Sequence, residues 1–276
     1  MKNILTFDVE EWFDANYPKV ELPKDDLKKS RLTEEIREIL DLCAQFNAKA
    51  TFFVLGRVAQ EKPHLVREIK GAGHEIASHG FEHKLVYKLS PQEFEKDLSK
   101  SLETLERITG EKVLGYRAPS WSLNENTAFV YSILAQKGLK YSSSVFPIKT
   151  SLYGLAESPR FPYLFGDGEQ KILEIPSSTI RFSGKNIPFA GGAYFRLLPS
   201  WIIKKGIKRL NKEGQPAIVY LHPRELDNSS PKLELPFFES FIHYSGVSGT
   251  KRKLVGILKE FEFGNIKDEI LPKYNL

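Results

Sequence analysis

Short β-like runs alternate with helical stretches along most of this chain, and this alternation limits the folds that it can adopt. Residues 50–55 are β-branched and aromatic, which is typical of a buried strand. Residues 90–93 read Ser-Pro-Gln-Glu, a capping box that predicts a helix beginning at Pro91. Strands that alternate with helices imply βαβ units and a mostly parallel sheet. We therefore predict an α/β fold, a distorted (β/α) barrel of about seven units, because no G-x-G-x-x-G motif of a dinucleotide-binding sheet follows the first strand.

The chain of 276 residues is expected to form one domain, residues 1–276. Its regular alternation breaks between about residue 142 and residue 187. Prolines stand in loop-like surroundings there, at Pro147, Pro159, Pro162 and Pro176. This pattern predicts a loop-rich insertion over one face of the barrel.

Composition excludes several classes of function. The net charge of +5 is too mild and too interspersed for a nucleic-acid-binding protein, although it suits an anionic substrate. Cys43 is the single cysteine, so any metal site must use histidine and carboxylate ligands. No apolar run approaches the roughly 20 residues of a membrane span, and the first residues lack the apolar region of a secretion signal. We expect a soluble, cytoplasmic protein.

Four polar groups follow predicted strands, each at the point where the strand ends. They are residues 8–11, 79–83, 117–119 and 222–225. The carboxyl ends of parallel barrel strands form one rim, so these groups are expected to converge in space.

The histidines and acidic residues of this rim have the spacing of a metal site. His79 and His83 are four residues apart, which on a tight turn points both rings the same way. Asp8 and Glu10 are two apart on an extended chain and face one side, while Glu11 points away. Two histidines with one carboxylate are the ligand set of a catalytic zinc or similar divalent ion. The alternatives are surface histidines and a solvated or helix-capping strand end.

Arg117 and His222 complete the rim. Arg117 precedes Ala118-Pro119 and is placed to orient a carboxylate, the alternative being a surface salt bridge of little energetic value. His222 follows the most apolar strand and precedes Pro223, which favours the rim over the alternative of a core histidine.

In this order the motifs resemble those of the NodB-type polysaccharide deacetylases, carbohydrate esterase family four. The matching segments are residues 6–10, 78–83, 116–119 and 220–223. Residues 8–13 and 191–196 further resemble the branch of that family linked to exopolysaccharide loci. The resemblance implies a distorted barrel of about seven units and a metal-dependent hydrolase that removes N-acetyl groups from an N-acetylated sugar or polysaccharide.

The resemblance also implies a role for each rim residue. Asp8 matches the catalytic base, His79 and His83 the metal-binding histidines, Arg117 the arginine that orients the base, and His222 the catalytic acid. The implied cofactor is a divalent metal, with zinc expected, and the implied partner is an N-acetylated carbohydrate.

This chain departs from the family pattern at two places. The second aspartate of the first motif, a metal ligand, is Val9 here, so we assign Glu10 to the metal. The fourth motif lacks its aspartate around residues 141–144, a role left vacant or filled by serine.

Trp121, Tyr194 and Phe195 are predicted to offer sugar-stacking surfaces, with core packing as the alternative. Two other functions remain open for the whole chain. One is an allantoinase-like cyclic amide hydrolase on the same barrel, and the other is a metal-free carbohydrate-binding pseudoenzyme, which Val9 would explain.

Overall fold

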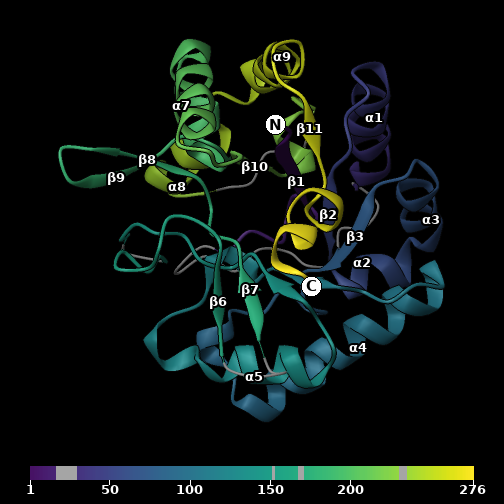
Figure 1. Cartoon of the computed structure of the whole chain (residues 1–276). Coiled ribbons are helices and arrows are strands. Elements are labelled where there is room, and N and C mark those ends of the chain that lie inside the picture. The colour runs from purple at the N-terminus through teal and green to yellow at the C-terminus, as the bar shows by residue number, and fades with distance from the viewer. Residues whose placement is uncertain (17–29, 151–152, 167–170, 230–234) are drawn as a thin grey trace.

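A curled and mostly parallel sheet forms the centre of the molecule, with helices around it (Figure 1). The structure is a computed structural model that describes residues 1–16, 30–150, 153–166, 171–229 and 235–276. The strand order is β10-β1-β2-β3-β4-β5-β7-β6, and β11 pairs with the start of β1. The seven strands from β10 to β7 are parallel, and β6 runs antiparallel at the edge. The predicted α/β barrel of about seven units is confirmed as a curled half-barrel.

The strands are β1 Asn3–Val9, β2 Thr51–Val54, β3 Glu75–Ser78, β4 Gly115–Tyr116, β5 Tyr141–Ser142, β6 Tyr163–Phe165, β7 Ile172–Glu174, β8 Thr179–Phe182, β9 Lys185–Pro188, β10 Ile218–Leu221 and β11 Phe263–Gly264. The α-helices are α1 Leu32–Gln45, α2 Gly56–Glu61, α3 Pro63–Gly71, α4 Pro91–Thr109, α5 Phe129–Gln136, α6 Gly192–Leu197, α7 Ser200–Lys212, α8 Phe237–Tyr244, α9 Val247–Leu258 and α10 Ile266–Glu269. Short 3₁₀ turns include η2 Val86–Lys88, η3 Pro119–Trp121 and η6 Pro223–Glu225.

Local sequence signals explain where α4 begins and ends. The Ser90 hydroxyl accepts a hydrogen bond from the Glu93 backbone N–H, and the Glu93 carboxylate accepts one from the Ser90 N–H. Gly110 then ends the helix at a φ of 70°, a left-handed conformation that glycine adopts without steric cost. The predicted capping box is therefore confirmed.

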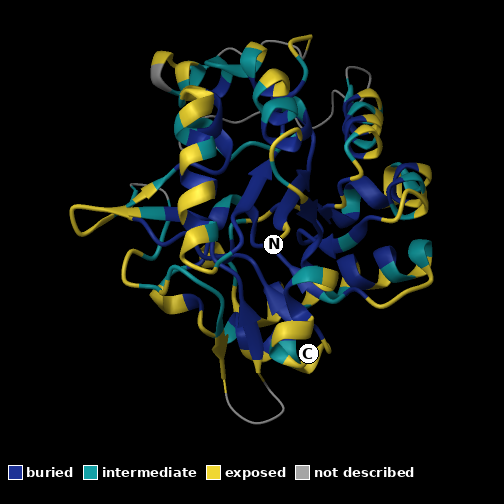
Figure 2. Cartoon of the chain, turned by 45° about the horizontal axis from the view of Figure 1, so that its top comes forward, coloured by how far each residue is buried: buried dark blue, intermediate teal, exposed yellow. Residues whose placement is uncertain are grey.

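The core lies between the sheet and the helices that cover it. Strands β1, β2 and β10 are buried along their whole length, and they form the dark centre of Figure 2. Within the described residues, no helix is both long and apolar enough to cross a membrane.

The stretch predicted as a loop-rich insertion, residues 142–187, contains four strands. β7 is fully buried and pairs parallel with β5, so it belongs to the central sheet. β8 and β9 form a separate antiparallel hairpin. Residues 151–152 and 167–170 of this stretch lie outside the described residues.

His74 gives the fold a defined sensitivity to acid. Its Nδ1 accepts a hydrogen bond from the Ala50 backbone N–H at 3.1 Å, and burial lowers its pKa from 6.5 to about 4. As the pH falls below 6.5, the unfolded chain binds a proton there but the folded chain does not, so stability is lost down to about pH 4. We expect the free energy of unfolding to fall by roughly 2 to 3 kcal/mol more in the wild type than in His74→Gln between pH 7 and pH 4.5.

Urea unfolding of both proteins at the two pH values measures this difference. His64→Gln on the exposed surface of α3 is the matched control and should follow the wild type. Equal losses in the wild type and His74→Gln would contradict the assignment to His74.

Candidate metal centre and active site

The four polar groups predicted to converge do converge at the carboxyl ends of the strands. Asp8 lies in β1 and Glu10 directly after it, His79 follows β3, and His222 follows β10. These four residues and His83 line one cavity of about 520 Å³. Each strand ends at this rim, so residues far apart in the sequence become neighbours.

Glu10, His79 and His83 each offer one ligand atom, and these three atoms lie within 4.8 Å of one another. Oε2 of Glu10 is 2.7 Å from Nε2 of His83 and 3.9 Å from Nε2 of His79. Two ligands of a tetrahedral zinc lie about 3.3 Å apart, so these distances bracket that geometry. Nε2 of His83 is buried and makes no hydrogen bond, although it lies this close to the carboxylate. The three residues therefore fit a divalent ion.

Both histidine rings are oriented from behind. Nδ1 of His79 lies 2.8 Å from the Arg117 carbonyl oxygen, to which it donates, so Nε2 keeps its lone pair for a metal. Burial lowers the pKa of His79 to about 4, which keeps the ring neutral. Nδ1 of His83 lies 3.1 Å from the side-chain amide of Asn16, a contact that the sequence did not indicate.

The backbone of His83 is unusual. Its φ is 57°, in the left-handed region that non-glycine residues rarely adopt. Such conformations cost of the order of 1–3 kcal/mol and persist where the surrounding structure imposes them, commonly at functional sites.

The carboxylate of Glu10 is ionised. Burial by itself raises its pKa, but the neighbouring His83 and His222 outweigh burial and bring the pKa well below its usual range. Glu11 points away as predicted, because the Ser30 hydroxyl donates to it at 2.6 Å and Lys62 lies 3.7 Å from it.

Asp8 is held by Arg117. Nη1 of this fully buried guanidinium donates to Oδ1 of Asp8 at 2.7 Å and to the Thr6 hydroxyl at 2.9 Å. Its Nε and Nη2 donate to the carbonyl and the hydroxyl oxygen of Ser143, both at 3.0 Å. A serine therefore stands in the fourth motif and supports the arginine.

His222 has a carboxylate partner that the sequence analysis did not identify. Its Nδ1 lies 3.3 Å from Oε2 of Glu225, which also accepts a hydrogen bond from the His222 backbone N–H at 3.0 Å. Burial lowers the pKa of His222, but Glu10 and Glu225 more than compensate, and the net shift is upward. On its other side, Nε2 of His222 lies 3.9 Å from Oδ2 of Asp8.

Glu225 is in turn fixed by Arg196 of α6. Nε of Arg196 donates to Oε1 of Glu225 at 2.8 Å, and its other nitrogens donate to the carbonyl oxygens of Ile242, His243 and Ser245. Both side chains are buried, which makes this a rigid support for His222. The signal in the sequence was the three-residue spacing of His222 and Glu225 across a turn.

Gly191 allows α6 to approach β10 closely enough to place Arg196. A Cβ on Gly191 would lie 2.1 Å from the ring of Tyr220. This close approach explains the glycine pair before α6.

The three predicted sugar-stacking residues have different fates. Trp121 lines the cavity, and its ring lies 5.0 Å from the Arg117 guanidinium. Tyr194 packs against Phe146 and is not among the lining residues. The prediction for Phe195 is wrong, because its side chain is fully buried in the hydrophobic core. Tyr153 lines the cavity instead and stacks on Phe146.

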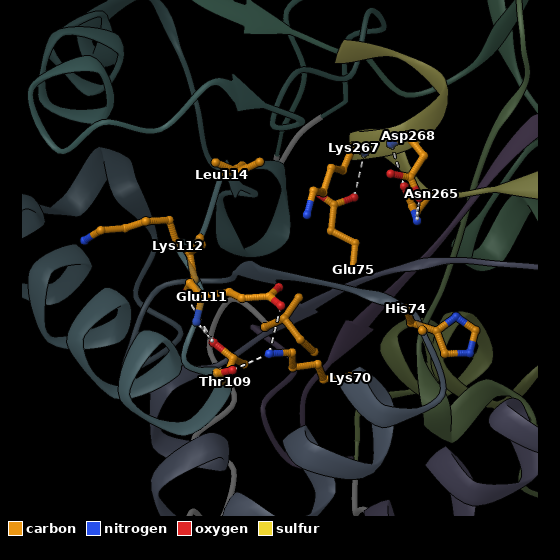
Figure 3. A pocket seen from close by; sticks show the side chains of 13 residues that line it. Lys70, His74, Glu75, Thr109, Glu111, Lys112, Leu114, Asn265, Lys267 and Asp268 are labelled. Atoms are coloured by element: carbon orange, nitrogen blue, oxygen red, sulfur yellow. Dashed lines mark hydrogen bonds and ion pairs between the residues drawn. The ribbon is translucent and has the colours of Figure 1, made fainter. Parts of the chain in front are cut away.

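A second cavity, of about 220 Å³, lies at the opposite, amino ends of the strands (Figure 3). Its buried carboxylate, Glu75, accepts hydrogen bonds from the Thr51 hydroxyl, the Tyr141 hydroxyl and the Lys267 backbone N–H. Lys70 at its edge pairs with Glu111. Since these charged groups already have partners, this cavity has the character of a structural region.

The fold and the site together define a (β/α)-barrel protein with a histidine–carboxylate centre at the carboxyl ends of its strands. The family model described as polysaccharide deacetylase matches residues 5–142, which is half of the chain, and the chain belongs to this family of N-acetyl sugar and peptidoglycan deacetylases. A second model, described as a domain of unknown function (DUF3473), matches residues 143–271.

Relatives and solved structures agree with this membership. A peptidoglycan-N-acetylglucosamine deacetylase of Bacillus cereus is 36% identical over 89 residues, which is 32% of this chain and 32% of that protein. The chain covers about 31% to 41% of the length of the first curated relatives that it matches.

Two solved structures share the fold. A putative polysaccharide deacetylase from Mycobacterium smegmatis has a TM-score of 0.65 at 21% identity, over 99% of this chain and 90% of that chain. The Puue allantoinase has a TM-score of 0.62 at 16% identity, over 94% and 85%. At these identities the likeness concerns the fold alone.

Proposed function

We propose that this protein is a metal-dependent hydrolase that removes N-acetyl groups from an N-acetylated sugar or polysaccharide. The observation that carries the proposal is the placement of Glu10, His79 and His83 as one ligand set beside Asp8, which Arg117 holds. Membership of the deacetylase family supports the substrate class. The chemistry of two imidazoles and one carboxylate favours zinc.

A divalent ion at this site would act as a Lewis acid, polarising the acetamide carbonyl and lowering the pKa of the attacking water. Asp8 accepts a proton from the water as its oxygen bonds to the carbonyl carbon. Arg117 keeps Asp8 ionised and fixes the direction of its lone pairs. The C–N bond then breaks as protonated His222 gives its proton to the amine nitrogen, leaving acetate and the free amino sugar.

His222 can give this proton because Glu225 stabilises the imidazolium. The Glu225 carboxylate lies 3.3 Å from Nδ1, which leaves Nε2 directed into the cavity toward Asp8 and Glu10. We propose Glu225 as the residue that positions His222, and Arg196 as the residue that holds Glu225. Trp121 and Tyr153 supply apolar walls against which a sugar ring can pack.

Acetate release tests the proposal directly. We expect the purified protein to release acetate from N-acetylglucosamine oligomers, to lose this activity when a chelator removes the metal, and to regain it on addition of zinc. Elemental analysis should find about one divalent ion per chain, because the structure offers one three-ligand set in its described part.

The same assay separates the alternatives. Hydrolysis of allantoin or cyclic imides without acetate release would support the cyclic amide hydrolase. A metal-free protein whose acetate release no added metal restores would support the pseudoenzyme.

A further inference from the structure

Arg224 is a cation in the cavity without an anionic partner. It lies in η6, between the proposed acid His222 and the positioning residue Glu225, and it lines the cavity while half-buried. Its Nε is buried and makes no hydrogen bond. In the described part of the chain no carboxylate lies within 4.0 Å of its guanidinium.

The other two arginines of the site are neutralised. Arg117 pairs with Asp8 at 2.7 Å, and Arg196 pairs with Glu225 at 2.8 Å. The guanidinium of Arg224 instead faces the ring of His243, with Nη1 3.3 Å from Nε2. Burial, together with Arg224 and Arg196, lowers the pKa of His243 to about 2, so this ring carries no charge that repels or balances Arg224 differently across the neutral pH range.

An unbalanced, half-buried cation is unfavourable for the free protein. Arg224 is also unfavourable for the acid, because its charge lowers the pKa of His222. A residue with these two costs gains a physical reason if a bound ligand supplies the missing anion.

We infer that Arg224 binds a carboxylate or phosphate group of the N-acetylated substrate, so that the cavity selects an anionic sugar. This inference rests on the proposed function and adds the substrate class to it. A guanidinium binds both kinds of group through two parallel N–H···O hydrogen bonds.

The rest of the cavity agrees with recognition at this one point. Lys88 also lines the cavity, exposed and without an ion pair in the described part of the chain. Glu239 lines it too, so the wall is not uniformly positive. The anion would therefore be recognised by contact with Arg224, and the net charge of +5 agrees with an anionic substrate.

Acetate release from four matched substrates tests the inference. They are a neutral N-acetylglucosamine oligomer, a disaccharide of N-acetylglucosamine and glucuronic acid, N-acetylmuramic acid, and N-acetylglucosamine 1-phosphate. We expect kcat/KM of the wild type to be at least tenfold higher for one charged substrate than for the neutral oligomer. The preferred substrate identifies the anion as a carboxylate or a phosphate.

The substitution Arg224→Gln should remove this preference. We expect its kcat/KM for the preferred anionic substrate to fall at least tenfold more than for the neutral oligomer, mainly through a higher KM, while Arg224→Lys keeps part of the preference. Arg252→Gln, the same substitution on the exposed surface of α9, should keep the wild-type preference.

Two results would overturn the inference. One is a wild type that uses neutral and anionic substrates equally well, and the other is an Arg224→Gln variant that loses activity equally on all of them. Both leave the proposed function standing, whereas no acetate release from any substrate overturns the proposed function itself.

Discussion

Asp8→Asn is expected to keep its metal and to lose turnover by roughly 100- to 10,000-fold, the usual contribution of a general base. Asp8 is outside the Glu10–His79–His83 ligand set, so metal content should not change. An asparagine oxygen can still accept the hydrogen bond from Arg117, but it cannot accept a proton from water at neutral pH. Elemental analysis and the kcat of acetate release measure the two effects separately.

Three further variants make this result specific. His79→Ala removes a ligand and should lose both metal and turnover. Asp8→Glu keeps the negative charge beside the buried Arg117, so the fold is preserved while the base is displaced and turnover falls. Asp41→Asn on the exposed surface of α1 should match the wild type. Wild-type turnover in Asp8→Asn would show that Asp8 is not the base.

The second large effect depends on the leaving group. His222→Gln should lower acetate release from an N-acetyl sugar by roughly 100- to 10,000-fold, because an unprotonated amine is a poor leaving group. The loss on an activated ester such as 4-nitrophenyl acetate should stay below about tenfold, because its leaving group departs without a proton. Comparison of kcat on the two substrates measures the contribution of the acid.

Glu225→Gln should show the same selectivity with a smaller loss, roughly 10- to 100-fold on the amide, as expected of a positioning residue. The amide oxygen of glutamine can still accept from the His222 backbone N–H, so the turn should persist. Glu103→Gln on the exposed surface of α4 is the matched control. Equal losses on amide and ester would assign His222 and Glu225 a structural role only.

The site shows how far local patterns reach. Asp8, Glu10, His79, His83 and His222 were predicted because each stands at the end of a recognisable strand, and parallel strands end at one rim. The substitution at Val9 left the third ligand uncertain from the sequence, and the fully buried side chain of Val9 shows why that position no longer faces the cavity.

Other features of the site depended on contacts between distant segments. Arg196 reaches Glu225 across 29 residues because α6 packs closely on β10, which no local pattern specifies. Phe195 and Tyr194 are neighbours in the sequence, yet the direction of α6 buries the first and turns the second toward Phe146. A residue's place on a short helix cannot be assigned to a face until its packing partner is known.

The sequence by itself determined the parallel α/β fold, the family and the residues of the rim, because strand composition, helix capping and polar strand ends are local properties. Only the tertiary structure decided that β7 joins the sheet, that Glu225 supports His222, and that Arg224 lacks an anionic partner in the cavity. These features follow from which surfaces pack together, and packing brings together side chains whose separation along the chain carries no signal of their contact.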